Sequence, residues 1–222
     1  MPLPYKNRAE AAHQLADLLQ PYADRPDVLV LALPRGGVPI AYEVARALNA
    51  PLDLIVVRKL GVPGHEELAM GAVAMGGIRV LNDEVIWGLA ISDEAIEQVT
   101  TAEQQELRRR ERVYRGERPA PTIQGRCVIL IDDGLATGAT MRAAVAAVRQ
   151  LQTAWIVVAV PVAAPEAIAA LRGETDEVVC PATPEPFLGI GRWYEDFAQM
   201  TDEEVRGLLE QAWRYRPAQE GS

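Results

Sequence analysis

The segment that most constrains the fold runs from Val128 to Met141. Four apolar residues, Val128–Ile131, end in two adjacent acids, Asp132 and Asp133. A short stretch of glycine, alanine and threonine follows and leads directly into the helical pattern Met141–Leu151. An uninterrupted apolar strand indicates burial on both faces, which is typical of a parallel sheet covered by helices. Ligands of such sheets bind beyond the carboxyl ends of the strands, so the two acids and the loop are predicted to line a site.

Other apolar runs of strand length alternate with helical patterns along the chain. The expected strands are Val28–Leu33, Leu54–Val57, Cys127–Ile131, Trp155–Val160 and Glu177–Cys180. The expected helices are Arg8–Gln20, Pro39–Leu48, Met141–Leu151, Pro165–Arg172 and Asp202–Tyr215, the last with Thr201 as its N-cap. This alternation predicts an α/β fold with a doubly wound, largely parallel sheet. A length of 222 residues fits one domain, residues 1–222.

One region breaks the alternation. Ser92–Arg118 has the pattern of a long polar helix, with Ser92 as its N-cap. It belongs to an expected helical insertion at about 83–118, which is predicted to pack on the core or on a second subunit of a homo-oligomer. The helix carries the arginines Arg108, Arg109, Arg110, Arg112, Arg115 and Arg118. They could contact phosphates, but a solvated face with pairs such as Glu106–Arg110 is favoured.

Charge and cysteine content exclude several classes of protein. With 31 acidic and 22 basic residues, the net charge is −9, which argues against a partner held by bulk positive charge, such as duplex DNA or an anionic membrane. No apolar run approaches the ~18 residues of a transmembrane helix. The N-terminus lacks the apolar stretch of a signal peptide, so a cytoplasmic location is expected. Cys127 and Cys180 fit no CxxC spacing, so neither zinc nor a disulfide scaffold is expected.

The loop after the acid pair has the chemistry of a phosphate site. A helix N-terminus preceded by small residues offers free backbone N–H groups and a positive dipole end. Asp132 and Asp133 instead suit sugar hydroxyls or a hydrated Mg²⁺. Together these features predict a phosphorylated sugar, with its phosphate on the loop and its hydroxyls on the acids.

These residues resemble the motif that binds 5-phosphoribosyl 1-pyrophosphate (PRPP) in type I phosphoribosyltransferases. In that motif, four apolar residues precede two acids and a Thr-Gly-x-Thr/Ser loop. The variant here, DDGLATGATM, is most similar to that of adenine phosphoribosyltransferases. It departs at Gly134, where that family usually has a bulky apolar residue, and a glycine is expected to loosen the loop. At Ala136, relatives that act on 6-oxopurines have an aspartate instead.

Two further segments support this resemblance. The sequence LPRGGVP, Leu33–Pro39, resembles the pyrophosphate-binding loop of the family. The stretch from Val57 to Glu67 resembles the mobile loop that closes over PRPP. The resemblance implies that pyrophosphate is bound by Arg35, Gly36, Gly37, Arg58 and Lys59.

A C-terminal extension at about 181–222 is expected after the last strand. Some family members place a base-binding hood there. In this chain Phe187, Trp193 or Tyr194 could stack on a nucleobase. The alternative is that these aromatic residues pin the tail onto the core.

The resemblance covers roughly residues 25–200 and implies an activity. It is the Mg²⁺-dependent transfer of a 5-phosphoribosyl group from PRPP to an acceptor nitrogen, as in nucleotide salvage, with release of pyrophosphate. Asp132 and Asp133 would hold the ribose hydroxyls and, through water, Mg²⁺. The 5′-phosphate would be bound by Ala136, Thr137, Gly138, Ala139 and Thr140.

The sequence leaves two other functions to compare with this activity. One is a PRPP-sensing regulatory protein of the same fold that binds nucleic acid, which only the arginine run of the insertion supports. The other is a phosphohydrolase or P-loop enzyme. It is disfavoured because the chain has no GxxxxGKS/T motif and the two acids are adjacent rather than spaced.

Overall fold

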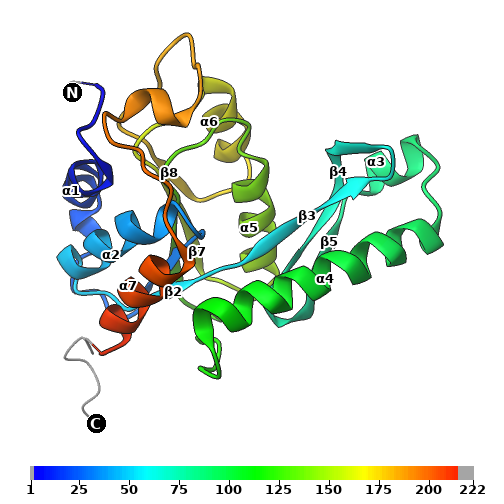
Figure 1. Cartoon of the computed structure of the whole chain (residues 1–222), viewed down its shortest axis with the longest axis horizontal. Helices are drawn as coiled ribbons and strands as arrows, with labels where there is room; N and C mark the ends of the chain where they lie inside the picture. Colours follow the sequence, from blue (N-terminus) through cyan, green and yellow to red (C-terminus); the bar gives the residue numbers. More distant parts are fainter. Residues whose placement is uncertain (1–2, 215–222) are drawn as a thin grey trace.

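The computed structural model describes residues 3–214 and is built on a five-stranded parallel sheet (Figure 1). The sheet has the order β2-β1-β6-β7-β8, and every pairing in it is parallel. Its strands are β1 (Val28–Ala32), β2 (Leu52–Leu54), β6 (Cys127–Ile131), β7 (Trp155–Ala159) and β8 (Glu177–Val179). All residues of β1 and β6 are buried, as their apolar runs predicted. The α/β class and the parallel sheet are therefore confirmed.

Helices cover both faces of this sheet. On one face α1 (Arg8–Leu18) and α7 (Asp202–Arg214) pack against α2 (Gly37–Ala47). On the other face lie α5 (Ala139–Gln150) and α6 (Pro165–Arg172). Short 3-10 turns occur at Gln20–Tyr22, Met75–Gly77 and Ile190–Trp193. The doubly wound arrangement is confirmed, and no helix among residues 3–214 is long and apolar enough to cross a membrane.

Helix α7 begins as the sequence predicted. The backbone N–H of Glu204 donates to Thr201 Oγ1 at 3.2 Å, and the N–H of Thr201 donates to Glu204 Oε2 at 2.8 Å. This reciprocal pair is a capping box. The helix ends at Arg214 in the structure, and the expected last residue, Tyr215, lies outside the described residues.

The strand order reverses between β1 and β6, which makes this the topological switch point of the sheet. The two strands pair in register, with Ala32 opposite Ile131. The loops that follow, starting at Leu33 and Asp132, therefore leave the same edge side by side. Ligands of open α/β sheets bind at such a point.

Residues 57–115 form an arm that extends away from the parallel sheet (Figure 1). The arm contains a second, antiparallel sheet of β3 (Val57–Val62), β4 (His65–Ala74) and β5 (Ile78–Leu81), followed by α3 (Asp83–Gly88) and α4 (Asp93–Arg115). The long polar helix is confirmed as α4, and Ser92 Oγ accepts from the N–H of Ala95 at 3.3 Å. The antiparallel sheet was not expected.

One strand prediction in this region is wrong. The expected strand Leu54–Val57 is divided between two sheets, because Leu54 ends β2 whereas Val57 begins β3 opposite Ala74. The stretch 57–67, expected to be a mobile loop, forms the hairpin of β3 and β4, and its closure over PRPP stays a prediction. Its Gly- and Pro-rich residues form the turn between these strands.

A buried ion pair joins the base of the arm to the edge of the parallel sheet. Arg115, the last residue of α4, lies 2.7 Å from Asp53 of β2, and both side chains are almost fully buried. Arg115 Nη2 also donates to the carbonyl oxygen of Leu54 at 3.3 Å. Burial raises the pKa of Asp53, and the charge of Arg115 opposes that rise. The arm is therefore fixed to the core by a charge pair inside the protein.

Candidate functional site

The glycine-rich loop after β1 lies in direct contact with the acid pair after β6. A Cβ atom on Gly36 would stand 2.0 Å from Asp133 Oδ2. A Cβ atom on Gly37 would stand 2.5 Å from the carbonyl oxygen of Ile131. Only glycines permit this approach, so the structure brings together the two segments that the sequence singled out separately.

The two acids have different surroundings. Asp133 is buried, and its Oδ2 accepts hydrogen bonds from Arg8 Nη2 at 2.9 Å and from Arg8 Nε at 3.1 Å. Asp132 is partly exposed, and its Oδ1 accepts from the N–H of Asp133 at 2.8 Å. Burial raises the pKa of both carboxyls, and the neighbouring Asp133 raises that of Asp132 further. Hydrogen bonding and charge from Arg8 oppose the rise at Asp133.

Arg8 is a site residue that sequence reasoning missed. It lies in the first turn of α1, its Nη1 donates to the carbonyl oxygen of Ala198 at 2.8 Å, and its guanidinium lies 4.0 Å from the centre of the Phe197 ring. A single arginine at the start of an amphipathic helix gives no local signal of such a contact. Through Arg8, the N-terminal helix thus contacts both the acid pair and the C-terminal segment.

The predicted phosphate loop is open and ends at the N-terminus of α5. Thr137, Ala139 and Thr140 are exposed, and the N–H of Ala139 donates to Thr137 Oγ1 at 3.4 Å. Gly138 is the N-cap of α5 and has φ of 71°, a left-handed conformation that favours glycine. First-turn N–H groups of α5 are therefore available to an anion beside the acid pair.

Gly134 does not loosen this loop, contrary to expectation. The N–H of Leu135 donates to the carbonyl oxygen of Val162 at 3.0 Å, and the N–H of Ala164 donates to that of Leu135 at 2.8 Å. A Cβ atom on Gly134 would stand 2.8 Å from Ile190 Cγ2. A side chain from the C-terminal segment thus fills the space, and backbone pairing with the neighbouring strand end holds the loop.

The five residues expected to bind pyrophosphate are divided between two places. Arg35 follows β1, and its Nη1 lies 3.7 Å from Asp202 Oδ1. Arg58 lies on β3 of the arm, where its Nε lies 2.6 Å from Glu103 of α4. Lys59 is its neighbour on the same strand. The structure places Gly36 and Gly37 at the acid pair, Arg35 next to Asp202, and Arg58 and Lys59 in the arm.

Comparison with known proteins agrees with this geometry. The family model described as a phosphoribosyl transferase domain matches residues 5–185. The chain belongs to the phosphoribosyl transferase family. The expected resemblance to type I phosphoribosyltransferases is thereby confirmed for family and fold.

Individual relatives match nearly all of this chain. The TT1426 protein from Thermus thermophilus has a crystal structure that matches with a TM-score of 0.86 at 41% identity, covering 94% of this chain and 99% of that one. A proposed phosphoribosyl transferase of Mycobacterium tuberculosis strain H37Rv is 44% identical over 210 residues, which are 95% of this chain and 47% of the relative. Its counterpart in strain CDC 1551 gives the same values. The chain thus spans about half the length of the curated relatives it matches.

The three aromatic residues of the C-terminal segment have separate surroundings. Tyr194 is buried, donates from its hydroxyl to the carbonyl oxygen of Asp133 at 2.7 Å and stacks on Phe197 with ring centres 4.9 Å apart. It therefore supports the acid pair and is not an exposed surface for a base, so the prediction for Tyr194 is wrong. Trp193 packs against Phe187, with ring centres 6.3 Å apart.

Phe187 also lines a cavity of about 780 Å³ beside the phosphate loop. The cavity is bordered by Ala136, Ala164, Pro165, Glu166, Glu185, Pro186, Phe187 and Gly189. Of the three aromatic candidates, only Phe187 borders this cavity together with a residue of the phosphate loop. Among the described residues, the lining of the cavity includes two acidic side chains, Glu166 and Glu185, and no lysine or arginine.

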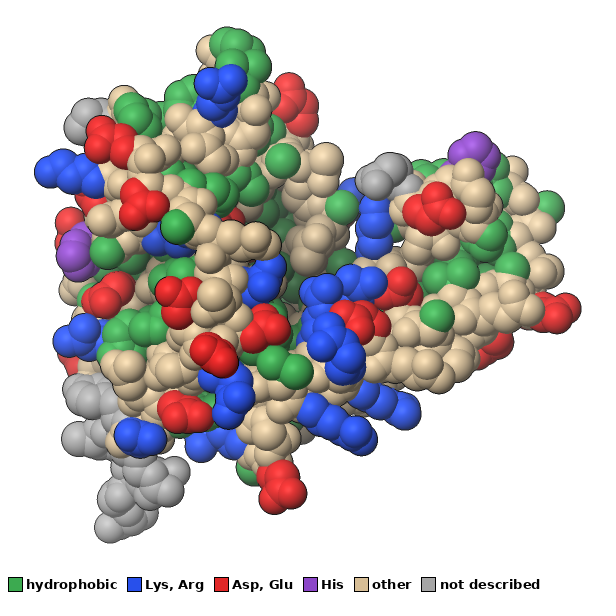
Figure 2. All heavy atoms as spheres, in the orientation of Figure 1, with side chains coloured by type: hydrophobic (Ala, Val, Ile, Leu, Met, Phe, Trp, Pro, Cys, Tyr) green, Lys and Arg blue, Asp and Glu red, His purple; other side chains and the backbone are tan. Residues whose placement is uncertain are grey.

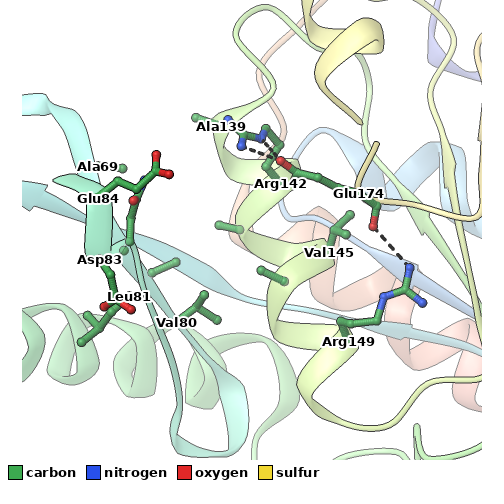
Figure 3. A pocket seen from close by; sticks show the side chains of 15 residues that line it. Ala69, Val80, Leu81, Asp83, Glu84, Ala139, Arg142, Val145, Arg149 and Glu174 are labelled. Atoms are coloured by element: carbon green, nitrogen blue, oxygen red, sulfur yellow. Dashed lines mark hydrogen bonds and ion pairs between the residues drawn. The ribbon is translucent and has the colours of Figure 1, made fainter. Parts of the chain in front are cut away.

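A further cleft of about 570 Å³ separates α5 from the arm (Figure 3). On the α5 side, Arg142 Nε donates to Glu174 at 2.8 Å and Arg149 Nη1 donates to Asp176 at 3.0 Å. Figure 3 shows both arginines turned toward Glu174, whereas Glu84 lies across the cleft. Because Glu174 and Asp176 neutralise these arginines on the α5 side of the cleft, the arginines add no free positive charge to the site.

Proposed function

We propose that this phosphoribosyl transferase moves the 5-phosphoribosyl group of PRPP to a nitrogen of a small acceptor and releases pyrophosphate, as a step of nucleotide salvage. The contact between Gly36 and the Asp133 carboxylate carries the proposal. It joins an anion-binding loop to an acid pair, beside the free N-terminus of α5. The loop after β1 can bind one anion, the acid pair can bind a sugar, and the N-terminus of α5 can bind a second anion.

The chain's residues would act mainly by position and charge. Backbone N–H groups of 137–140 bind the 5′-phosphate, while Arg35 and the N–H groups of Gly36 and Gly37 bind pyrophosphate. Cleavage of the sugar–pyrophosphate bond leaves positive charge on the ribose. Asp132, the more exposed acid, binds the ribose hydroxyls and stabilises that charge. Asp133, held by Arg8, fixes the backbone from which Asp132 projects.

The acid pair suits Mg²⁺ only together with substrate and water. The described residues contain no group of three or more His, Cys, Asp or Glu side chains that could enclose a metal. Mg²⁺ commonly keeps several waters and binds through one or two carboxylates plus substrate phosphates, so the donors present fit it. Asp132 would hold the ion through water, because Asp133 Oδ2 is engaged by Arg8. When bound, Mg²⁺ neutralises charge on the pyrophosphate.

The cavity beside Ala136 supports a particular class of acceptor. Glu166 and Glu185 accept hydrogen bonds and repel anions, whereas Phe187 offers an aromatic face. We therefore propose an acceptor that carries N–H donors and no carboxylate. Adenine is the first candidate, because the loop DDGLATGATM resembles that of adenine phosphoribosyltransferases.

We propose a cytoplasmic location, with which two free cysteines are compatible. Cys127 and Cys180 are both free thiols. Burial raises the pKa of each to about 11, so both stay protonated at neutral pH.

A base panel tests the proposed function. Purified protein, PRPP and Mg²⁺ are combined with adenine, uracil, hypoxanthine, guanine, xanthine and orotate, and pyrophosphate release is followed. Release that depends on one of the uncharged acceptors supports the proposal. PRPP binding by calorimetry, without release for any acceptor, would instead indicate a PRPP sensor, and a nucleic-acid shift that weakens steeply with salt would identify its partner.

A further inference from the structure

The structure divides the arginine run of α4 by position. Arg115 is buried against Asp53, while Arg108, Arg109 and Arg112 are exposed and Arg110 is half-buried. Arg109 and Arg110 differ from Arg108 and Arg112 because they border a cavity at the base of the arm. Figure 2 shows lysine and arginine side chains gathered where the arm meets that body. The run is thus not one uniform solvated face.

Arg109 and Arg110 line a small polar cavity of about 180 Å³ next to the glycine-rich loop. The cavity is bordered by Pro34, Arg35, Arg109, Arg110, Val113, Tyr114 and Asp202. Three arginines from two distant parts of the chain therefore border one space. Of the residues that the structure describes, Asp202 alone contributes a carboxylate to the border of the cavity.

Asp202 occupies a position that suits an anion. Its Oδ1 accepts a hydrogen bond from the hydroxyl of Tyr114 at 2.7 Å and lies 3.7 Å from Arg35 Nη1. Burial and this hydrogen bond raise the pKa of Tyr114 to about 12, so the hydroxyl remains a donor at neutral pH. The C-terminal helix α7 thus places a carboxylate of the protein itself at a cavity that three arginines border.

The two α4 arginines keep donors for a ligand. Both pair with Glu106: Arg109 donates from Nε at 2.7 Å and from Nη2 at 2.9 Å, and Arg110 donates from Nε at 2.8 Å. Within residues 3–214, no partner is found for the Nη groups of Arg110. Counting Glu106 and Asp202 against Arg35, Arg109 and Arg110 leaves one positive charge in excess.

The cavity adjoins the proposed PRPP site directly. Arg35 borders the cavity, and the next residue, Gly36, touches the Asp133 carboxylate. A group that extends from a ribose on the acid pair past Gly36 reaches Arg35 and then Arg110. The cations assigned to pyrophosphate in the arm, Arg58 and Lys59, lie further out. Arg58 is paired with Glu103, about 9 Å along α4 from Arg109.

We propose that Arg109 and Arg110 complete, with Arg35, a subsite for the outer phosphate of the pyrophosphate group, and that Asp202 competes with this phosphate. The inference rests on the proposed function, because it assigns one end of the same substrate. It gives the arm a role in the site, as the source of two further cations beside Arg35. The Asp202 carboxylate limits how tightly the leaving group is held and so favours its release.

Calorimetry with inorganic pyrophosphate tests this subsite, with Arg110→Gln compared against Arg112→Gln. Both variants remove one positive charge from the same helix, but Arg112 is exposed and does not border the cavity. Glu106 keeps Arg109 as a partner in both. Losing a charge-assisted hydrogen bond predicts about tenfold weaker binding for Arg110→Gln. Arg112→Gln is expected to stay near wild type, and Asp202→Asn, which retains an acceptor for Tyr114, is expected to bind pyrophosphate more tightly.

Equal affinities for the Arg110→Gln and Arg112→Gln variants would overturn the inference, as would a wild-type protein that does not bind pyrophosphate. Unchanged or weaker binding by the Asp202→Asn variant would remove the competitor role. Pyrophosphate release from PRPP is measured in parallel on the wild type. If the wild type releases pyrophosphate from PRPP but its pyrophosphate affinity does not depend on Arg110, only the subsite is rejected. If the affinity depends on Arg110 but the wild type releases no pyrophosphate from PRPP, only the proposed transferase activity is rejected.

Discussion

Arg8 and Asp133 stand 125 positions apart in the chain, yet the guanidinium of one donates two hydrogen bonds to a single carboxylate oxygen of the other. Both side chains are largely buried. The pair joins the N-terminal helix to the loop that leaves the central strand β6. Asp133 is therefore engaged inside the protein, and Asp132 is the acid better placed to meet a sugar.

Replacing Arg8 by methionine is expected to destabilise the protein strongly. The variant leaves the Asp133 carboxylate buried without its cation, which typically costs about 3–5 kcal/mol of unfolding free energy. Urea unfolding measures this loss. The exposed pair Arg25–Asp27 offers a control, because Arg25→Met should cost only about 0–1 kcal/mol. Adding Asp133→Asn to the Arg8→Met variant should restore part of the loss, and no restoration would contradict a charge-based role.

Replacing Asp132 by asparagine is expected to raise stability at neutral pH and to lower turnover about 100-fold, as loss of one preorganised electrostatic group does. The pKa of Asp132 is raised in the folded protein, by burial first and by Asp133 second. The folded state then keeps a proton over a pH range in which the unfolded chain has lost it, so wild-type stability falls as pH rises through that range.

Thermal unfolding of this variant across pH provides the check. The gain in stability should be absent well below the unfolded-state pKa of about 4 and should grow as pH rises above it. A variant that is less stable at pH 7, or that turns over at the wild-type rate, would contradict the role assigned to Asp132.

The sequence predicted those parts of the fold whose burial is set by local pattern. Strands β1 and β6 are wholly apolar and wholly buried, so their periodicity was sufficient. Strand β2 was misplaced because Asp53 interrupts its apolar run. That acid is buried only because Arg115, 62 positions later, pairs with it. The antiparallel sheet was missed because its Gly- and Pro-rich turn has the composition of a loop.

The same distinction applies to the candidate site. The acid pair, the phosphate loop and Arg35 lie directly after strands, so position along the chain was enough to find them. Arg8 contacts the acid pair, and Arg109 and Arg110 border the neighbouring cavity, from helices that start elsewhere in the chain. Nothing within a few residues of them indicates which surface they will meet. Only the packing of α1 and of the arm settles that.

Replacing Arg115 by methionine is expected to loosen the arm from the core. Asp53 would remain buried without its partner, at a cost of about 3–5 kcal/mol. Urea unfolding checks the cost, with exposed Arg112→Met as the matched control on the same helix. Hydrogen exchange should then show faster exchange at the base of α4 than in β6. Unchanged exchange at α4 would show that other contacts hold the arm.

Replacing Gly138 by valine is expected to abolish PRPP binding. At φ of 71° a β-branched residue is strained, and any Cβ atom would stand 3.3 Å from Ala167 Cβ. The loop would shift and its N–H groups would no longer converge on a phosphate. Calorimetry with Mg²⁺ and PRPP measures the loss. Gly173→Ala is a suitable control because its backbone is helical at φ of −84°. Wild-type affinity in the Gly138→Val variant would place the phosphate elsewhere.

The acceptor preference gives the last prediction. Ala136 borders the cavity that holds Phe187, and its methyl group can neither accept a proton nor form a hydrogen bond. Relatives that act on 6-oxopurines have an aspartate at this point of the motif, where it can assist proton transfer at the purine ring.

Because loss of a general base typically costs a factor of ~10² to 10⁴ in rate, hypoxanthine, guanine and xanthine should be poor acceptors. Adenine should support faster pyrophosphate release, and orotate should be excluded by Glu166 and Glu185. Ala136→Asp should narrow the difference in rate between hypoxanthine and adenine. Fastest release with guanine or xanthine in the wild type would show that another group supplies the base. Glu166 and Glu185 would then be the first residues to replace, because both border the cavity in which the acceptor would lie.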